Sequence, residues 1–432
     1  EEPEEPEEPE EPEEPEEPEE PEEPEEPGAF IDPGPNMPEP RADYEVDQHV
    51  LVNGYIPVAS AEELVQINQE GESLIFGAGT KWEDTYTSGM NQKYIQVADI
   101  DMSGYLAENT WQSIGSDTGS FFTGIYDGNG YAINNFAVDM PDVSYMALFY
   151  GASEDFEIKN ITFNNISING MTAVGSIVGL IREADESSII ENIVVNGEIA
   201  GSYDVGGIIG QNFGTYCNIS GIHMNADIRG DGSIGGIMGL TGSDTLSLDN
   251  ILVTGDIEGS ASIGGLIGLT HNEGETYIMD VAVKDNLLSS NYVGGLVGVG
   301  GFTEATNILV SPNQVIIINN GGRVGGMVAN WHRQPGLHVD STYINLNIQA
   351  QESGYVAGGL VASYLNYDTD QVPVIRNSEI NCTFDSFSYT GGLFGFARTD
   401  RLDLYNVGIT LDIKNTLDVY MYSGVYIGYV RP

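Results

Sequence analysis

The sequence predicts an all-β fold, a parallel β-helix (solenoid), preceded by a short capping helix and a disordered, acidic, proline-rich N-terminal tail. Three features predict this fold class: a glycine motif that recurs every 29 to 33 residues, a column of asparagines in register with it, and apolar alternation after each asparagine. A fixed period near thirty residues is typical of one supersecondary unit stacked on itself, whose apolar faces are buried by neighbouring copies.

The glycine motif is clearest at 293–298, where the sequence reads Val-Gly-Gly-Leu-Val-Gly. The corresponding glycines stand at positions 175, 206, 235, 264, 294, 325, 358, 391 and 424. Such a glycine marks a place where no side chain fits or where the backbone turns with positive φ. The two positions after each glycine pair are both apolar, as at Leu296 and Val297. Either the pair bends the chain so that both columns point inward, or one column is an exposed apolar stripe suited to self-association.

The asparagine column places one polar residue in each repeat, and seven of its ten positions are asparagine. The asparagines are Asn135, Asn160, Asn192, Asn250, Asn307, Asn377 and Asn406, and the other members are Gly221, Asp280 and Ser341. Stacked at strand spacing, each amide can donate to one neighbour and accept from the other. The column therefore predicts a structural ladder rather than a row of glycan acceptors.

Each member of the column is followed by a strand pattern. The first and third following positions are mostly apolar, as in Ile161 and Phe163, and the position between them varies. The intermediate positions are Thr162, Val194, His223, Leu252, Ala282, Leu309, Tyr343, Glu379 and Gly408. This alternation predicts a strand with one face inside. Helical repeats of similar length would show 3.6-residue periodicity and few glycines, whereas this chain has 55 glycines.

Composition divides the chain into three predicted parts. Residues 1–45 are predicted to be a disordered Glu-Glu-Pro tether and linker, because the nine triplets at 1–27 have nothing to bury. Residues 46–134 should hold the N-terminal cap and first coils, and residues 135–432 the glycine-motif β-helix repeats. Within the cap, Ser60-Ala-Glu-Glu63 forms a capping box that opens a short helix. This helix is expected to cover the open edge of the first coil.

The chain carries a net charge of −52, and subtracting the eighteen carboxylates of residues 1–27 still leaves −34. Nucleic acid and anionic membrane are therefore not expected as partners, because phosphate neutralisation requires a basic surface. No run of 18 apolar residues occurs, so no transmembrane segment is expected. The Glu-Pro start resembles a mature or trimmed N-terminus more than a signal peptide.

Two small groups of residues are candidates for binding. Asp99, Asp101 and Asp127 lie in oxygen-rich turns that could hold Ca²⁺, although Asp127-Gly-Asn-Gly130 lacks the spacing of a calcium loop and also fits a plain turn. Trp331, His332 and Arg333 could stack on a sugar, or the tryptophan could pack within its own insertion loop. No cofactor is expected. None of the five histidines forms a His-Glu-x-x-His zinc motif.

The repeats resemble a known family. Gly-Gly-Leu-Val-Gly at 294–298 and Gly-Gly-Leu-Ile-Gly at 264–268 are similar to the GLUG motif of bacterial surface proteins, including the stalks of IgA-specific metallopeptidases and large adhesins. The region before them is also similar, above all Trp111-Gln-Ser-Ile-Gly115 and the segment 122–131. The resemblance implies a right-handed parallel β-helix displayed outside a bacterial cell, with 135–432 as GLUG-type repeats. It implies no activity, because these repeats serve as scaffolds.

We therefore expect a non-catalytic adhesin or structural β-helix module, secreted or at the bacterial cell surface. Its expected partner is an extracellular glycan or protein, or a homo-oligomer or filament formed through the β-helix end or the apolar stripe. The alternative is a β-helical polysaccharide-degrading enzyme that uses paired carboxylates, of which 48 acidic residues outside the first 27 offer many combinations. Ice binding is disfavoured because the outward column is not a row of threonines.

Overall fold

The computed structural model describes residues 39, 41–116, 120–186, 188–271, 274–284, 286–289, 291–312, 315–317, 322–332, 336–365, 372–398, 401–414, 422–424 and 427–430. Within these ranges, the backbone but not the side chain is described at residues 289, 316, 317, 332, 350–355, 386–388, 422–424 and 427–430. Residues 1–38, which include most of the predicted disordered tether, lie outside the described residues.

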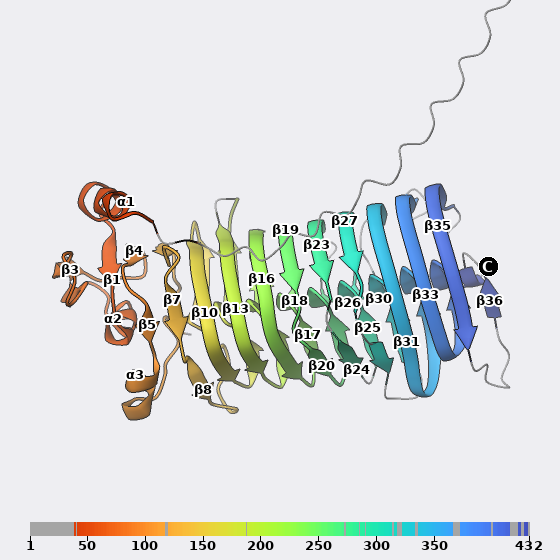
Figure 1. Cartoon of the computed structure of the whole chain (residues 1–432), viewed down its shortest axis with the longest axis horizontal. Coiled ribbons are helices and arrows are strands. Elements are labelled where there is room, and N and C mark those ends of the chain that lie inside the picture. Colours follow the sequence, from red (N-terminus) through yellow and green to blue (C-terminus); the bar gives the residue numbers. More distant parts are fainter. Residues whose placement is uncertain are drawn as a thin grey trace, which may run out of the picture.

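The chain is a parallel β-solenoid in which successive coils stack along one axis, and the helices lie at its N-terminal end (Figure 1). This arrangement confirms the predicted all-β solenoid fold. Among the described residues, a 25-stranded sheet and a 10-stranded sheet wrap around the interior, and a separate two-stranded antiparallel hairpin, β2–β3, belongs to the cap. Each glycine-motif repeat supplies one strand to the 10-stranded sheet, so the sequence period is the length of one coil.

The cap and first coils contain the helices and the shortest strands. Their bounds are α1 Asp43–Asp47, the π-helix η1 Gln48–Val52, β1 Ile56–Val58, α2 Ala61–Gln66, β2 Ser73–Phe76, β3 Asp84–Thr87, β4 Lys93–Gln96, β5 Ile100–Asp101, α3 Ser103–Glu108, β6 Ile125–Asp127, β7 Ala132–Asn134 and β8 Ala137–Asp139. The division into a cap at 46–134 and repeats at 135–432 stays a prediction.

The 10-stranded sheet consists of β9 Phe149–Glu154, β12 Val178–Ala184, β15 Ile209–Phe213, β18 Met238–Thr241, β22 Ile267–Thr270, β26 Val297–Gly300, β30 Val328–His332, β32 Val361–Leu365, β34 Phe394–Arg398 and β37 Ile427–Val430. The large sheet contains β1 and β4 to β8 of the first coils together with the remaining strands of the later coils. These later strands are β10 Glu157–Asn169, β11 Thr172–Val174, β13 Ile189–Ala200, β14 Tyr203–Gly206, β16 Tyr216–Gly230, β17 Ser233–Gly235, β19 Thr245–Val253, β20 Ile257–Gly259, β21 Ser262–Gly264, β23 Glu275–Val283, β24 Leu287–Ser289, β25 Tyr292–Gly294, β27 Glu304–Val310, β28 Val315–Ile317, β29 Arg323–Gly325, β31 His338–Gly358, β33 Val374–Gly391, β35 Asp403–Lys414 and β36 Tyr422–Gly424.

The predicted capping helix is α2, and its first turn is fixed by two side chains. Ser60 Oγ accepts a hydrogen bond from the Glu63 amide at 3.3 Å, as an N-cap residue does. The buried Glu63 carboxylate accepts from the amides of Ala59, Gly77 and Ala78 at 2.7, 3.0 and 2.8 Å. Glu63 therefore links the helix to the turn after β2. A capping box by itself would connect only residues at the start of the helix.

The glycine pairs are corners between the two sheets. Strand β14 ends at Gly206 and β15 begins at Ile209, so the chain turns between them. Ile208 and Ile209 are both fully buried, and the corresponding pair is buried in every repeat from Ile177 and Val178 to Leu393 and Phe394. The alternative of an exposed apolar stripe at these positions is therefore wrong. Both columns point inward because the corner interrupts the two-residue alternation.

The asparagine column marks a second corner. All ten predicted members have left-handed backbone, with φ between +46° and +64°. Asparagine and glycine tolerate this conformation best, which explains both the recurrent asparagine and its replacement by Gly221. Strand register passes through the corner without a shift: Lys159 pairs with Glu191 before it, and Ile161 pairs with Ile193 after it. The corner lets apolar residues on both sides of it reach the core.

Candidate functional site

The predicted ladder asparagines form hydrogen bonds between some coils but not between all of them. Asn192 Nδ2 donates to Asn160 Oδ1 at 3.1 Å, and Asn406 Nδ2 donates to Asn377 Oδ1 at 3.2 Å. Aspartates take the accepting position elsewhere, because Asn307 Nδ2 donates to Asp280 at 2.5 Å and Asn377 Nδ2 to Asp340 at 3.1 Å. What the column shares throughout is its left-handed backbone, which Asn250 also has.

Asn135 does not belong to this column. The sequence alignment paired it with Asn160, which is wrong, because Asn135 occupies a different corner of its coil. Its amide Nδ2 donates to Asp101 at 3.0 Å, and its Oδ1 accepts from Asn165 Nδ2 at 2.7 Å. Asn160 instead stacks on Asp127, at 2.9 Å. The early coils have a second left-handed corner five residues after the first, at Asn165, and Asn135 belongs to that one.

A further asparagine ladder escaped the sequence alignment. Asn164 Nδ2 donates to Asn134 at 3.2 Å, Asn196 Nδ2 to Asn164 at 3.2 Å, and Asn225 Nδ2 to Asn196 at 3.1 Å. The Asn-Asn dipeptides at 134–135 and 164–165, which repeat at the coil period, are the sequence feature that indicates this ladder. This ladder joins four successive coils through uncharged side chains.

The three predicted calcium ligands are occupied by contacts between neighbouring coils. Asp99 accepts from the Ala132 amide at 2.8 Å, and Asp101 accepts from Ser103 and Asn135 at 3.0 Å each. The hydrogen bond from Asn135 lowers the pKa of Asp101 below its usual value. Over the part of the chain that the structure describes, no group of three or more His, Cys, Asp or Glu side chains gathers around a possible metal position. Calcium binding stays a prediction.

Asp127, the third predicted ligand, is fully buried and anchors the segment before α1. Its Oδ2 lies 3.1 Å from Arg41 Nη1, and its Oδ1 accepts from the Asn129 amide at 2.8 Å. The same Arg41 Nη1 also contacts His49 Nε2 at 2.5 Å. Burial lowers the pKa of His49, and the positive charge of Arg41 acts in the same direction.

The predicted sugar-stacking residues are placed differently from the expectation. The Trp331 side chain is buried in the core, where its ring lies 5.3 Å from that of Phe302 and 5.6 Å from that of Tyr364. Sugar stacking by this indole is therefore wrong. The alternative of a packed tryptophan is correct, but the ring packs on Phe302 and Tyr364 of neighbouring coils and not within its own loop. The side chain of His332 and all of Arg333 lie outside the described residues.

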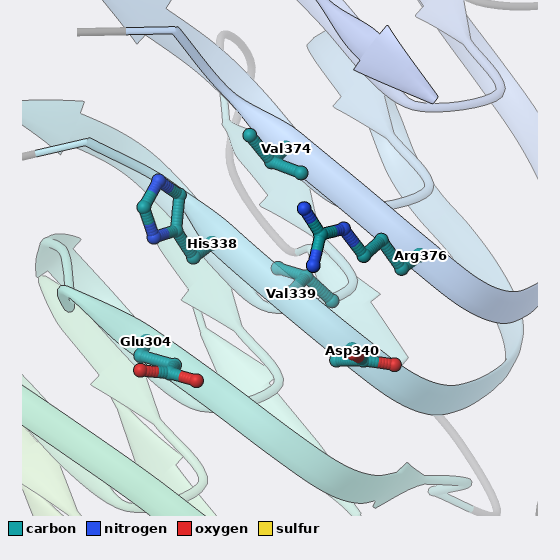
Figure 2. Close-up of a pocket in the computed structure, with 6 residues that line it drawn as sticks. All are labelled: Glu304, His338, Val339, Asp340, Val374 and Arg376. Atoms are coloured by element: carbon teal, nitrogen blue, oxygen red, sulfur yellow. The ribbon is translucent and has the colours of Figure 1, made fainter. Parts of the chain in front are cut away.

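A hollow of about 110 Å³ lies on the outer face of β27, β31 and β33 (Figure 2). Its lining residues are Glu304, His338, Val339, Asp340, Val374 and Arg376. Strand register explains the grouping, since Glu304, His338 and Val374 stand side by side on three neighbouring strands. The Arg376 guanidinium lies 5.4 Å from the centre of the exposed Tyr405 ring on β35.

The hollow combines two carboxylates, an imidazole and a guanidinium beside an aromatic ring. Asp340 Oδ1 is partly engaged, because it accepts from Asn377 Nδ2 and from Ser341 Oγ, both at 3.1 Å. Donors and acceptors of this kind hydrogen-bond to hydroxyl groups, and an aromatic face can pack on a sugar ring. The geometry suits a polar ligand rather than a strongly charged one, because both signs of charge line the hollow. The hollow could not be recognised in the sequence, because its lining residues are spread over 72 positions, from Glu304 to Arg376.

One carboxylate pair is notable in view of the enzymatic alternative. The carboxyl groups of Asp155 and Asp185 share a hydrogen bond, which raises the pKa of Asp155. Glycoside hydrolases separate their two carboxyl groups by about 5 Å or more, which leaves room for the sugar or a water molecule. Carboxyl groups in direct contact lack that space, so this pair does not match a glycosidase site.

No protein-family model matches the chain. A stretch of 134 residues is 31% identical to halomucin of Haloquadratum walsbyi, covering 30% of this chain and 1% of that protein. A stretch of 172 residues is 28% identical to the immunoglobulin A1 protease of Streptococcus sanguinis, covering 36% of this chain and 9% of that protein. A crystal structure described as an immunoglobulin A1 protease candidate from Bacteroides ovatus aligns over 66% of this chain and 84% of that chain, with 18% identity and a TM-score of 0.46.

These curated relatives are far longer than the matched stretch, and the chain spans at most 9% of either one. In the described part of the chain, no helix has both the length and the hydropathy of a membrane span. The resemblance inferred from the glycine motif agrees with the sequence match to the protease. Over 36% of its length the chain is similar to part of an immunoglobulin A1 protease, and it folds as a parallel β-solenoid.

Proposed function

We propose that this chain is a non-catalytic, extracellular β-solenoid module of a surface or secreted protein, and that it binds a neutral glycan or a protein. The observation that carries the proposal is the mixed polar hollow at Glu304, His338, Asp340 and Arg376 on the outer face of β27, β31 and β33. The names of the relatives, a halomucin and an immunoglobulin A1 protease, support an extracellular setting. A stack of in-register strands is a stiff scaffold, which suits a display role.

The hollow is proposed as the contact surface because its side chains are held at fixed spacing by three neighbouring strands. Glu304, His338 and Arg376 are exposed, whereas the apolar residues beside them in each strand, such as Ala305 and Ile375, are buried in the core. Ligand contacts are therefore made by side chains that do not contribute to the core. Substitution at these positions should alter binding with little effect on folding.

The experiment is a glycan array and a protein overlay with the full chain, repeated with Arg376→Ala and Tyr405→Ala. Each variant should weaken binding at least about fivefold, because removing a central Arg or Tyr contact typically costs more than about 1 kcal/mol. Arg229→Ala is the matched control, since Arg229 is also an exposed arginine but lies on β16 beside Asp227 and Glu258. Equal binding by all three variants would place the contact surface elsewhere.

The enzymatic alternative is tested with the same preparation. Incubation with polysaccharides, followed by measurement of new reducing ends, should give no turnover above a heat-denatured sample. Depolymerisation would overturn the non-catalytic assignment. Light scattering of the sample separates binding by a 46.5 kDa monomer from assembly through the end of the solenoid, which would give a heavier species.

A further inference from the structure

One outward-facing column of the solenoid is unexpectedly apolar. The outer column, defined here as Thr162, Val194, His223, Leu252, Ala282 and Leu309, follows the asparagine corner on six neighbouring strands. Strand register places each member directly beside the next. No member is a carboxylate or a lysine or arginine, although the chain has 66 acidic residues. Such a column on the surface of a highly acidic solenoid requires an explanation.

Four of the six members of the outer column are buried without being part of the core, and His223 and Leu309 are half-buried. Val194, Leu252 and Ala282 are only 1%, 7% and 0% exposed. Their neighbours in sequence, such as Ile251 and Val253, belong to the main hydrophobic cluster, whereas these three residues belong to neither of the hydrophobic clusters formed by buried residues. Because alternate residues of a strand point to opposite faces, the column points away from the core and is covered from outside.

Polar atoms beside the column also lack partners among the described residues. His223 Nδ1 and Asp249 Oδ1 are both occluded from solvent and have no hydrogen bond there. Buried polar atoms are almost always satisfied, so a covering group should supply hydrogen bonds at this place. Backbone amides of an extended segment could donate to both acceptors.

The path of the N-terminal chain indicates what covers the column. The helices α1 and η1 cover the outer face of the first coil, where Val46 and Val50 pack on Ile95. Arg41 lies one strand further along, since its partner Asp127 pairs with Ile95. Asp127 in turn pairs with Lys159 of β10, the strand that carries Thr162. Followed backwards from residue 50 to residue 41, the chain therefore advances along this face toward the outer column.

The preceding segment has a suitable length and composition. Residues 28–38 read Gly-Ala-Phe-Ile-Asp-Pro-Gly-Pro-Asn-Met-Pro and contain one charged residue. Eleven residues in polyproline II conformation span about 34 Å. Six parallel strands, at about 4.8 Å per step, span about 24 Å. The segment is therefore long enough to follow the whole column, and Phe30, Ile31 and Met37 supply apolar side chains.

We propose that residues 28–38 of this same chain dock in extended form along the outer column and cover it. The acidic Glu-Glu-Pro repeats would then leave the solenoid surface near β27 instead of at the N-terminal cap. Docking would fix the direction and the starting point of this tether along the solenoid. It would also shield an apolar strip that could otherwise pair with a second molecule.

Thiol labelling of the full chain tests the proposal. Leu252→Cys reports on the outer column, and Tyr203→Cys is the exposed reference, since Tyr203 is 58% exposed on β14. The native Cys217 and Cys382 are buried, and burial raises the pKa of each to about 12, so both react slowly. The segment is disrupted by Phe30→Asp, Ile31→Asp and Met37→Asp together. The matched control is Pro15→Asp, Pro18→Asp and Pro21→Asp together, all outside the segment.

Maleimide should label Leu252→Cys at least about tenfold more slowly than Tyr203→Cys, and the triple substitution in 28–38 should remove that protection. The control triple should leave it unchanged. Protection that survives the triple substitution overturns the proposal. If such protection also increases with protein concentration, the column is covered by a second copy. Circular dichroism of each variant establishes that the solenoid is intact.

Discussion

Asparagine recurs at one corner of each coil because the backbone there is left-handed. The side chain then finds a partner in the next coil where one is available, as between Asn192 and Asn160 at 3.1 Å. Position 221 shows that the left-handed backbone is a stronger requirement than the amide hydrogen bond. Gly221 has no side chain to donate, yet its φ is +64°. Backbone conformation, and only secondarily the amide ladder, selects the residue at this corner.

The first prediction concerns Asn250, which has φ of +53°. Asn250→Gly should leave stability nearly unchanged. Asn250→Val should lower the free energy of unfolding by about 1–3 kcal/mol, because a β-branched residue is strained in left-handed backbone. Urea-induced unfolding measures the difference. Ser247→Val, on the same strand but without positive φ, is the control. Equal stability of the Gly and Val variants would contradict the backbone explanation.

The second prediction concerns His49, whose pKa burial lowers, with Arg41 acting in the same direction. The unfolded chain binds a proton near pH 6.5, whereas folded His49 resists protonation. The stability that neutral His49 provides is therefore present above that pH and lost as the pH falls toward the folded-state pKa.

The thermal midpoint of the native chain should accordingly fall more between about pH 7.5 and about pH 5 than the midpoint of His49→Gln. The exposed His338 provides the matched control, as His338→Gln. If His49→Gln and the native chain lose the same amount of stability on acidification, His49 does not contribute to the acid sensitivity. His49 lies 2.5 Å from Arg41, so protonation of His49 would place two positive charges in contact.

At the scale of single elements, the glycine pairs fit the two sheets together at each corner. A Cβ on Gly265 would collide with the carbonyl oxygen of Gly295 in the next coil and lie 2.6 Å from Val283 Cγ1. The first glycine of the pair, Gly264, would collide with the carbonyl oxygen of Ile267. Neither has positive φ, so close approach of other backbone atoms, within the corner for Gly264 and from the next coil for Gly265, requires glycine here.

The third prediction follows from that contact. Gly265→Ala should lower the free energy of unfolding by about 1–3 kcal/mol, because an added carbon in a packed site forces the backbone apart. Gly408→Ala is the matched control, since its Cβ would meet only Glu379 Cγ at 3.8 Å. Denaturant midpoints of both variants, compared with the native chain, measure the effect. A similar midpoint for the two alanine variants would mean that the corner can widen without cost.

Element identity was largely predictable, whereas element alignment was not. The period of the glycines and the alternation after each asparagine indicated stacked strands, and Ser60 with Glu63 indicated α2. Asn135 was misaligned because the early coils contain two left-handed corners, and sequence alone does not say which one an asparagine occupies. Trp331 was expected on an insertion loop, but it belongs to strand β30 and its side chain lies in the core.

At the scale of the whole molecule, charge opposes the regular stack. The chain carries −52, and repulsion between like charges on successive coils destabilises a compact state. Ion pairs offset little of this repulsion. In most of those among the described residues, such as Arg401 with Asp403, at least one of the two side chains is exposed to solvent. Apolar side chains inside every coil supply the stability instead.

The fourth prediction is that the thermal midpoint rises as NaCl increases from about 0.05 M to about 1 M, because the screening length falls to about 3 Å. A chain without residues 1–27 retains −34 and should show a similar rise. Differential scanning calorimetry of both chains measures the shift. A rise confined to the full-length chain would assign the repulsion to the Glu-Glu-Pro repeats instead of the solenoid.

The sequence by itself determined the stacking of coils, since a fixed period of glycines and of left-handed asparagines can be satisfied only when each repeat lies on the next. It also determined the acidic surface and the capping helix. Only the tertiary structure decided which side chains meet across coils, because register brings together residues about thirty or more positions apart. The hollow at Glu304, His338 and Arg376 and the buried outer column both arise from that register.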